Sequence, residues 1–282
     1  MDDSFFSMLR SAVSVPGLWE LTVTLMAVAA VLIPLERLAP ARRVPAPARR
    51  TVLLNLAYWF FTPAFTKTLT AALLGCVLLG VFLAQGRAIS SALLDGFGPL
   101  SRQPLWLQTV QILLLADLID YWTHRTFHTS RLWRFHAVHH SAEEMTWLAA
   151  GRMHPVNDVV TRVCQVVPIV LLGYSPKGVM LAVPYLVVYV IFLHSNLRWD
   201  FGPLRYVLVS PAYHRWHHTT DAEGIDKNFA GIFPVWDLLF GTCHFPRREP
   251  TRFGVHRDPV PETLWGQMAY PFRNAPAPSD GR

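Results

Sequence analysis

Eight histidines recur in three short clusters, and their spacing is the clearest chemical signal in the chain. Residues 124–128 read HRTFH, residues 136–140 read HAVHH and residues 214–218 read HRWHH. Positions three or four residues apart lie on one face of an α-helix, so each cluster presents its imidazoles together. The eight residues are His124, His128, His136, His139, His140, His214, His217 and His218.

Imidazoles gathered in this number are typical of a metal site. Charged rings would repel one another and buried neutral rings would need partners, whereas neutral imidazole is the commonest metal ligand. Eight ligands exceed the four of a single zinc ion, so two metals with open positions fit better. Nitrogen ligands suit iron, copper, zinc and nickel alike. The chain lacks the HExxH sequence of zinc proteases, and two irons that activate oxygen are the best fit.

Long apolar segments must position these clusters. Of the 282 residues, 52% are hydrophobic and 16% charged, which is typical of a membrane protein. The segments long enough to approach a span of about 20 residues are residues 18–35, 51–84 and 105–122, with a hairpin of 159–172 and 179–193. Residues 51–84 contain Pro63, and one kinked helix is favoured there over a re-entrant pair. No removable signal peptide is expected.

The expected fold class is all-α. It is an integral membrane helical bundle of four or five membrane helices, including the hairpin, with a helical cap on the cytosolic face that carries the histidine di-metal site. The loop APARRVPAPARR has four arginines, and the positive-inside rule places it in the cytoplasm. With a far-side loop at residues 85–103, both histidine regions reach that same face. The predicted domains are membrane helices and loop (1–103), a catalytic domain (104–245) and a cytosolic tail (246–282).

Several motifs together resemble the fatty acid hydroxylase and sterol desaturase superfamily, particularly its bacterial members. They are HRTFH, LWRFHAVHHS, HSN, PAYHRWHHTT, NFAGIFPVWDLLFGT and QMAYPF, between about Pro104 and Arg273. The resemblance implies a multi-pass enzyme of the bacterial inner membrane with a histidine-liganded di-iron centre at the cytoplasmic face. Such an enzyme uses oxygen and two electrons to hydroxylate or desaturate a lipid, for example a sterol-like molecule or a fatty acyl chain.

The resemblance also extends the set of candidate ligands. It implies that the eight clustered histidines hold the metals and that His194, in FLHSN, is a ninth ligand or a partner of one. His154, in GRMHP, matches a further family histidine, with ligand and non-ligand roles both open. Bacterial members often carry a glutamate three residues after that histidine, where this chain has Asn157. This departure puts the usual role of the segment in doubt.

Three other residues are candidates to support the ligands, and none is expected to act in catalysis directly. Asp120 lies one helical turn before His124, and its carboxylate could accept the free ring N–H of a ligand histidine. Asn228 and Asp237 lie in family-like motifs, where structural hydrogen bonding is expected. Asp117, on the helix face of Asp120, is interpreted as a polar contact between helices.

The expected partners follow from what the sequence lacks. It has no flavin or nicotinamide fingerprint and no iron–sulfur cysteines, so the electrons must come from outside the chain, from a donor such as a ferredoxin or cytochrome with its reductase. The substrate is expected to be a lipid from the bilayer, with no nucleic-acid partner. Zinc could replace iron in purified protein. The alternatives are a non-catalytic or zinc-holding lipid-binding or sensor protein, and a metal transporter, which would place histidines along a crossing path.

Overall fold

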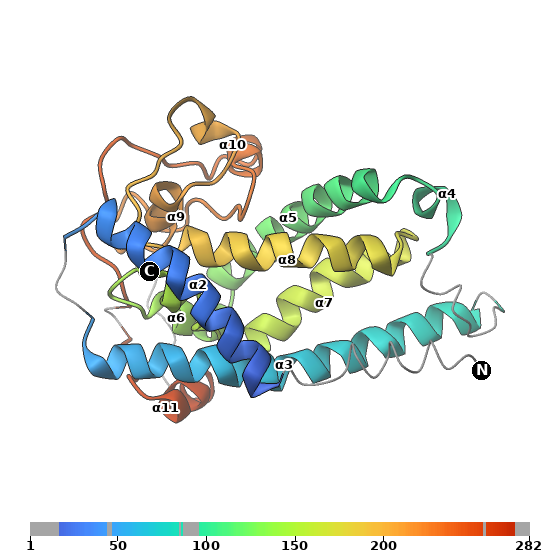
Figure 1. The fold of residues 1–282 in the computed structure, drawn as a ribbon, viewed down its shortest axis with the longest axis horizontal. Helices are drawn as coiled ribbons and strands as arrows, with labels where there is room; N and C mark the ends of the chain where they lie inside the picture. The colour runs from blue at the N-terminus through green and yellow to red at the C-terminus, as the bar shows by residue number, and fades with distance from the viewer. Residues whose placement is uncertain (1–16, 44–46, 85, 87–95, 256–257, 274–282) are drawn as a thin grey trace.

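The computed structural model describes residues 17–43, 47–84, 86, 96–255 and 258–273. Most of the expected far-side loop and part of the expected tail therefore lie outside the described residues. The described regular elements are helices, which confirms the all-α prediction (Figure 1). The α-helices are α2 (Leu18–Leu38), α3 (Arg49–Ala84), α4 (Gly98–Ser101), α5 (Leu105–Thr129), α6 (Trp133–His140), α7 (Pro155–Leu171), α8 (Pro176–Leu193), α9 (Pro211–His217), α10 (Val235–Leu239) and α11 (Leu264–Ala269). Short 3-10 helices are η2 (Trp147–Gly151), η3 (Gly202–Tyr206) and η4 (Tyr270–Phe272).

Three described helices are long and apolar enough to cross a membrane, by length and composition. They are α2, residues Arg49–Val77 of α3, and α8. Large apolar side chains such as Met26, Phe65 and Met180 are exposed on them, as expected for contact with lipid. These surfaces indicate a membrane-associated protein. Whether α5 and the 17-residue α7 also cross the membrane stays a prediction.

The helix expected at residues 51–84 is continuous. It runs from Arg49 to Ala84 with Pro63 inside it, which confirms one helix rather than a re-entrant pair. The predicted hairpin corresponds to α7 and α8, joined by a short turn. Both limbs pack against α5, and α7 also packs against α3. The core between α5, α7 and α8 contains Ile112, Ile169 and Ala182, each at most 1% exposed.

Three helices near the histidines begin with the same local signal. A side-chain acceptor precedes the helix, and a proline occupies the first helical position, where its missing N–H costs nothing. Before α7, the His154 ring accepts a hydrogen bond from Val156 N. The hydroxyls of Ser175 and Ser210 accept in the same way at the starts of α8 and α9. These signals fix the residues at which α7, α8 and α9 begin.

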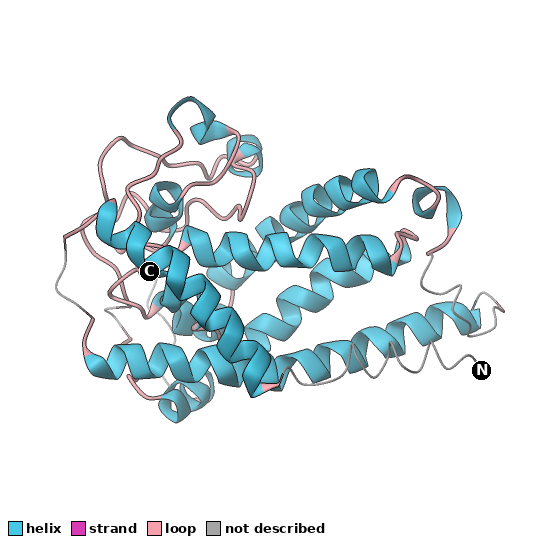
Figure 2. Cartoon of the chain, viewed as in Figure 1, coloured by secondary structure: helices cyan, strands magenta, loops and turns pink. Residues whose placement is uncertain are grey.

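The fold brings the histidine-bearing ends of four helices to one end of the molecule. Both α5 and α8 run from the α4 end toward α6 and α9 (Figure 1). Figure 2 shows that most of the described loops gather at that end, around α9 and α10. A buried cluster that includes Tyr121, Leu193, Tyr213 and Phe229 joins the ends of α5, α8 and α9 to these loops. The loops therefore lie where they can contact the histidines.

Candidate metal centre

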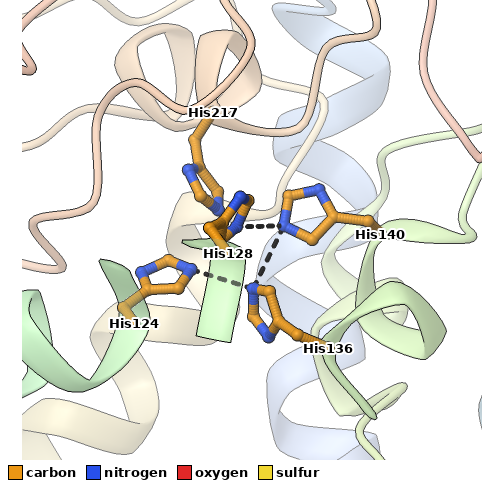
Figure 3. Close-up of side chains that lie close together, drawn as sticks. All are labelled: His124, His128, His136, His140 and His217. Carbon is orange, nitrogen blue, oxygen red and sulfur yellow. Dashed lines mark hydrogen bonds between the residues drawn. The ribbon is translucent and has the colours of Figure 1, made fainter. Parts of the chain in front are cut away.

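All nine predicted ligand histidines lie in two adjacent groups. The five-histidine group is His124, His128, His136, His140 and His217, and the four-histidine group is His139, His194, His214 and His218. Within each group, one ring nitrogen per residue lies within 4.8 Å of the others. Figure 3 shows the five rings of the first group turned toward one another. The groups touch where the His140 and His218 rings stack, with centroids 4.3 Å apart.

Helix geometry divides each HxxHH cluster between the two groups. On α6, His136 and His140 are four residues apart and face the five-histidine group, while His139 faces the four-histidine group. The cluster at α9 is divided the other way. His217, three residues after His214, joins the five-histidine group, while His214 and His218 face the four-histidine group. Each short helix therefore contributes ligand candidates to both groups.

The hydrogen bonds of the rings define which nitrogen is free in the five-histidine group. His124 Nδ1 lies 2.9 Å from the Phe229 carbonyl oxygen, and His217 Nδ1 lies 2.9 Å from that of Lys227. A carbonyl oxygen can only accept, so each Nδ1 carries the proton and each Nε2 is a bare lone pair. His217 Nε2 is buried and has no hydrogen-bond partner among the described residues. A metal ligand needs such a nitrogen.

His136 follows the same rule with a side-chain acceptor. Its Nδ1 lies 2.7 Å from Asn157 Oδ1, while Asn157 Nδ2 donates to Thr161 Oγ1. The His136 Nε2 lone pair then faces the His124 Nε2 lone pair at only 2.9 Å. Two lone pairs at that distance repel unless a cation lies between them. Nitrogens about 2.1 Å from one metal are about 3.0 Å apart when the bond angle is near 90°, so the spacing fits a shared metal.

The four-histidine group repeats this arrangement in part. His139 Nδ1 donates to the Arg152 carbonyl at 3.0 Å, and His194 Nδ1 donates to that of Val190 at 2.7 Å. Their Nε2 atoms, which therefore lack protons, are 3.0 Å apart. By contrast, Nδ1 of His214 and Nδ1 of His218 are buried without a hydrogen-bond partner in the described part of the chain. Both groups fit a metal, but their rings are held differently.

Burial keeps these imidazoles neutral. Desolvation, with repulsion from neighbouring rings, holds the pKa of His140, His214 and His218 well below the usual value. The same causes lower the pKa of His139. Neutral imidazole is the form that binds metals, so the folded protein presents its ligands ready for binding.

His154 lies outside both groups, and Asp120 does not bond His124 in the described structure. The His154 ring belongs to neither group, and its Nε2 lies 3.3 Å from the Met268 carbonyl oxygen. His124 Nδ1 bonds the Phe229 carbonyl rather than the Asp120 carboxylate. Asp120 instead faces Gly231, where an added Cβ would lie 3.4 Å from Asp120 Oδ2.

Asn228 and Asp237 make structural hydrogen bonds in the loops above the site. The Asn228 side chain bonds the backbone of Tyr213 and of His244. The Asp237 carboxylate accepts from the backbone N–H groups of Phe229 and Ala230. Neither side chain bonds a histidine of the two groups in the described structure, so each acts through the backbone that it holds.

Several groups that bond the rings were not predicted from the sequence. Asn157 was noted only as a departure from a family pattern, yet it bonds His136. Asp226 Oδ1 lies 3.2 Å from His128 Nδ1. Four other rings donate to backbone carbonyl oxygens. Every residue has a backbone carbonyl, so residue type does not indicate which one accepts. Three of the acceptors lie within residues 226–229, where Asp226 and Asn228 adopt positive φ values that are uncommon for residues other than glycine. Sequence spacing gives no sign of these conformations.

The fold and the two groups define a class, namely helical membrane-associated proteins with adjacent groups of buried histidines that could hold metal. Residues 109–242, which include all nine histidines, match the family model described as fatty acid hydroxylase. The chain belongs to the fatty acid hydroxylase superfamily through this region.

Curated relatives are similar to this chain over part of its length. An ornithine lipid hydroxylase of Rhizobium tropici is 32% identical over 172 residues, which is 60% of this chain and 51% of the relative. An alkylglycerol monooxygenase of Danio rerio is 35% identical over 160 residues, or 56% and 35% of the two chains. A very-long-chain aldehyde decarbonylase of Oryza sativa is 29% identical over 205 residues, or 65% and 32%. The chain thus spans about half of the first relative and about a third of the others. No solved structure matches the chain.

Proposed function

We propose that this protein is a membrane-bound oxidoreductase that uses O2 and two external electrons to hydroxylate or desaturate a C–H bond of a lipid, at two irons held by the nine histidines. The observation that carries the proposal is the close approach of Nε2 atoms in each group, at 2.9 Å and 3.0 Å, between rings whose Nδ1 atoms already donate to other acceptors. Relatives named as a lipid hydroxylase and a monooxygenase support the reaction class.

The reaction explains why a metal pair is needed. No side chain can supply an oxidant strong enough for an unactivated C–H bond, and two irons, when bound, supply oxygen activation. Hydroxylation converts R–H, O2, two electrons and two protons into R–OH and water. Desaturation converts a –CH2–CH2– unit with the same co-reactants into –CH=CH– and two waters. Both reactions begin at the same C–H bond, so the histidines alone do not select between them.

The chain's own residues hold the metals and keep the site dry. Eight of the nine rings are 6% exposed or less, which limits access of bulk water. The apolar helices α2, α3 and α8 extend from the end that holds the rings, so a lipid can approach from the bilayer. A polar head group would then stay at the interface, and the lipid is the proposed substrate class.

The electron donor is proposed to be a ferredoxin or a cytochrome with its reductase. The chain has a net charge of +6, which would attract an acidic partner. With the arginine-rich loop on the cytoplasmic side, the donor would meet the site on the cytoplasmic face of a bacterial inner membrane.

The first test is metal content and oxygen use by protein purified without air in a mild detergent. We expect about two irons per chain by elemental analysis, and oxygen consumption when a reductant and a membrane lipid extract are added. Mass spectrometry of the extract should show a lipid that gains one oxygen atom or loses two hydrogens. The matched His217→Ala variant should give neither result.

Two outcomes would contradict the proposal. One tightly held zinc with no oxygen uptake would support a zinc-holding or sensor protein instead. Iron movement across sealed proteoliposomes without lipid oxidation would support a metal transporter.

A further inference from the structure

Five consecutive backbone N–H groups donate to two buried carboxylates. Phe229 N donates to Asp237 Oδ1 at 2.8 Å, and Ala230 N donates to Asp237 Oδ2 at 2.9 Å. The N–H groups of residues 231 and 232 donate to Asp117 Oδ1, and that of residue 233 donates to Asp117 Oδ2, at 2.8–3.0 Å. The backbone of residues 229–233 is thus held along its length by Asp117 and Asp237.

These carboxylates are costly to bury. Asp117 is 2% exposed and Asp237 is 0% exposed, and neither forms an ion pair within the described residues. Their charge is balanced by N–H and O–H donors alone, which include Trp236 Nε1 for Asp117 and the Tyr213 hydroxyl for Asp237. Such an arrangement stabilises one backbone conformation strongly, because releasing the loop would leave two buried charges without partners.

The backbone held in this way leads directly to the metal ligands. We call residues 226–233 the acceptor loop. Within it, Asp226 Oδ1, the Lys227 carbonyl and the Phe229 carbonyl accept from His128, His217 and His124, respectively. Three of the five rings in the five-histidine group therefore depend on this loop for their orientation.

In the described structure, no ring of the four-histidine group bonds the acceptor loop directly. Its bonded rings use the carbonyls of Arg152 and Val190, which lie outside the acceptor loop. Asp117 also shares α5 with His124 and His128, so one helix carries two ligand candidates and a clamp for the loop that orients them. The approach is close at Gly231, where an added Cβ would lie 3.2 Å from Asp117 Oδ1.

We propose that Asp117 and Asp237 are positioning residues that set the metal affinity of the five-histidine group through the acceptor loop. The proposal rests on the proposed metal centre and adds which residues tune one of its two positions. Groups that orient ligand histidines change metal affinity by about 10–100-fold when removed. Because both carboxylates hold the same segment, we expect their effects to be less than additive.

The test is a titration of metal-free protein in detergent with Co²⁺, read by the visible absorption of the bound ion. Wild type should bind two Co²⁺ per chain. Asp117→Asn replaces an acceptor by an N–H donor that faces other donors, and should weaken one site by about 10–100-fold while the other keeps its affinity. Asp237→Asn should weaken the same site. In a His217→Ala background, which keeps only the four-histidine site, Asp117→Asn should change nothing.

Gln108→Ala is the matched control for lost stability. Gln108 is also a buried polar residue on α5, and its side chain bonds Ser101, Gln103 and Ser175 at the other end of the helix. We expect Gln108→Ala to lower the thermal unfolding temperature but to leave both Co²⁺ affinities unchanged.

The outcomes separate this inference from the proposed function. If wild type binds no Co²⁺, the metal centre itself is refuted. If wild type binds two and Asp117→Asn also binds two with unchanged affinity, only the inference fails. An equal loss at both sites in Asp117→Asn and in Gln108→Ala would show a general structural role and would overturn it as well.

Discussion

The five-histidine group and the four-histidine group differ in how the protein holds their rings. In the five-histidine group, His124, His128, His136 and His217 each bond an acceptor through Nδ1. In the four-histidine group, only His139 and His194 do so, and the Nδ1 atoms of the other two rings are buried without partners in the described structure. A ring with a fixed tautomer and orientation is a better ligand. The two proposed metal positions should therefore differ in affinity.

The two groups are nevertheless mechanically joined. The α6 helix gives two rings to the five-histidine group and one to the four-histidine group, and the cluster at α9 divides the opposite way. A small rotation of either helix would therefore disturb both positions. A difference in affinity should then come from the groups that bond the rings rather than from the helices.

The largest expected effect comes from removing one ligand from each group. His217→Ala should lower the iron content from two to one per chain by emptying the five-histidine group, and His139→Ala should do the same for the four-histidine group. Either change should lower lipid oxidation by at least about 100-fold, because removing a ligand should cost more than removing a group that only orients one. Elemental analysis and product mass spectrometry measure both results.

His244→Ala is the control for these two variants, since His244 belongs to neither group. It should keep both irons and most of the activity. A fully loaded and active His139→Ala or His217→Ala protein would refute the ligand assignment.

A smaller effect is expected at Asn157, which bonds a ring of the five-histidine group alone. Asn157→Ala removes the acceptor 2.7 Å from His136 Nδ1 and should weaken Co²⁺ binding at one of two sites by about 10–100-fold. Asn157→Asp keeps an acceptor and adds charge, so it should bind at least as tightly as wild type. Equal weakening at both sites in Asn157→Ala would contradict the separation of the two groups.

Sequence spacing was enough to predict the helices and the set of clustered rings. The i, i+3, i+4 patterns at residues 136–140 and 214–218 depend only on helix periodicity, and the structure gathers all of these histidines. His194 was suggested by family resemblance, and the structure places it in the four-histidine group. The single long helix α3 followed from its length and apolar composition.

The division of the rings into groups, and the atoms that orient them, could not be predicted in this way. Which side of α6 faces which group depends on tertiary packing. Four rings bond backbone carbonyls, and every residue type carries one. Asp117 was interpreted as a contact between helices. Its acceptor role for backbone N–H groups could not be predicted, because these groups lie more than 100 positions away in the chain.

The order in which a chelator removes the two metals tests whether the two groups differ in affinity. On titration with a chelator, we expect the four-histidine metal to leave first, with an affinity about 10-fold lower, because two of its ligands lack bonded Nδ1 atoms. The His217→Ala protein, which keeps only that metal, should lose it at the same chelator concentration as the first phase in wild type. Loss of both metals in one phase, or a first phase missing from His217→Ala, would contradict the unequal affinities.

The smallest expected effect lies one hydrogen bond further from the metal. Thr161 Oγ1 accepts from Asn157 Nδ2 at 3.3 Å and so helps to keep Oδ1 turned toward His136. Thr161→Val keeps the shape of the side chain but removes this bond, which is worth about 1 kcal/mol or less at such length. Because the Asn157 acceptor remains in place, Co²⁺ affinity should fall only about two- to threefold, and only at the five-histidine site. A loss as large as that of Asn157→Ala would mean that the orientation of the amide, rather than its presence, controls the ligand.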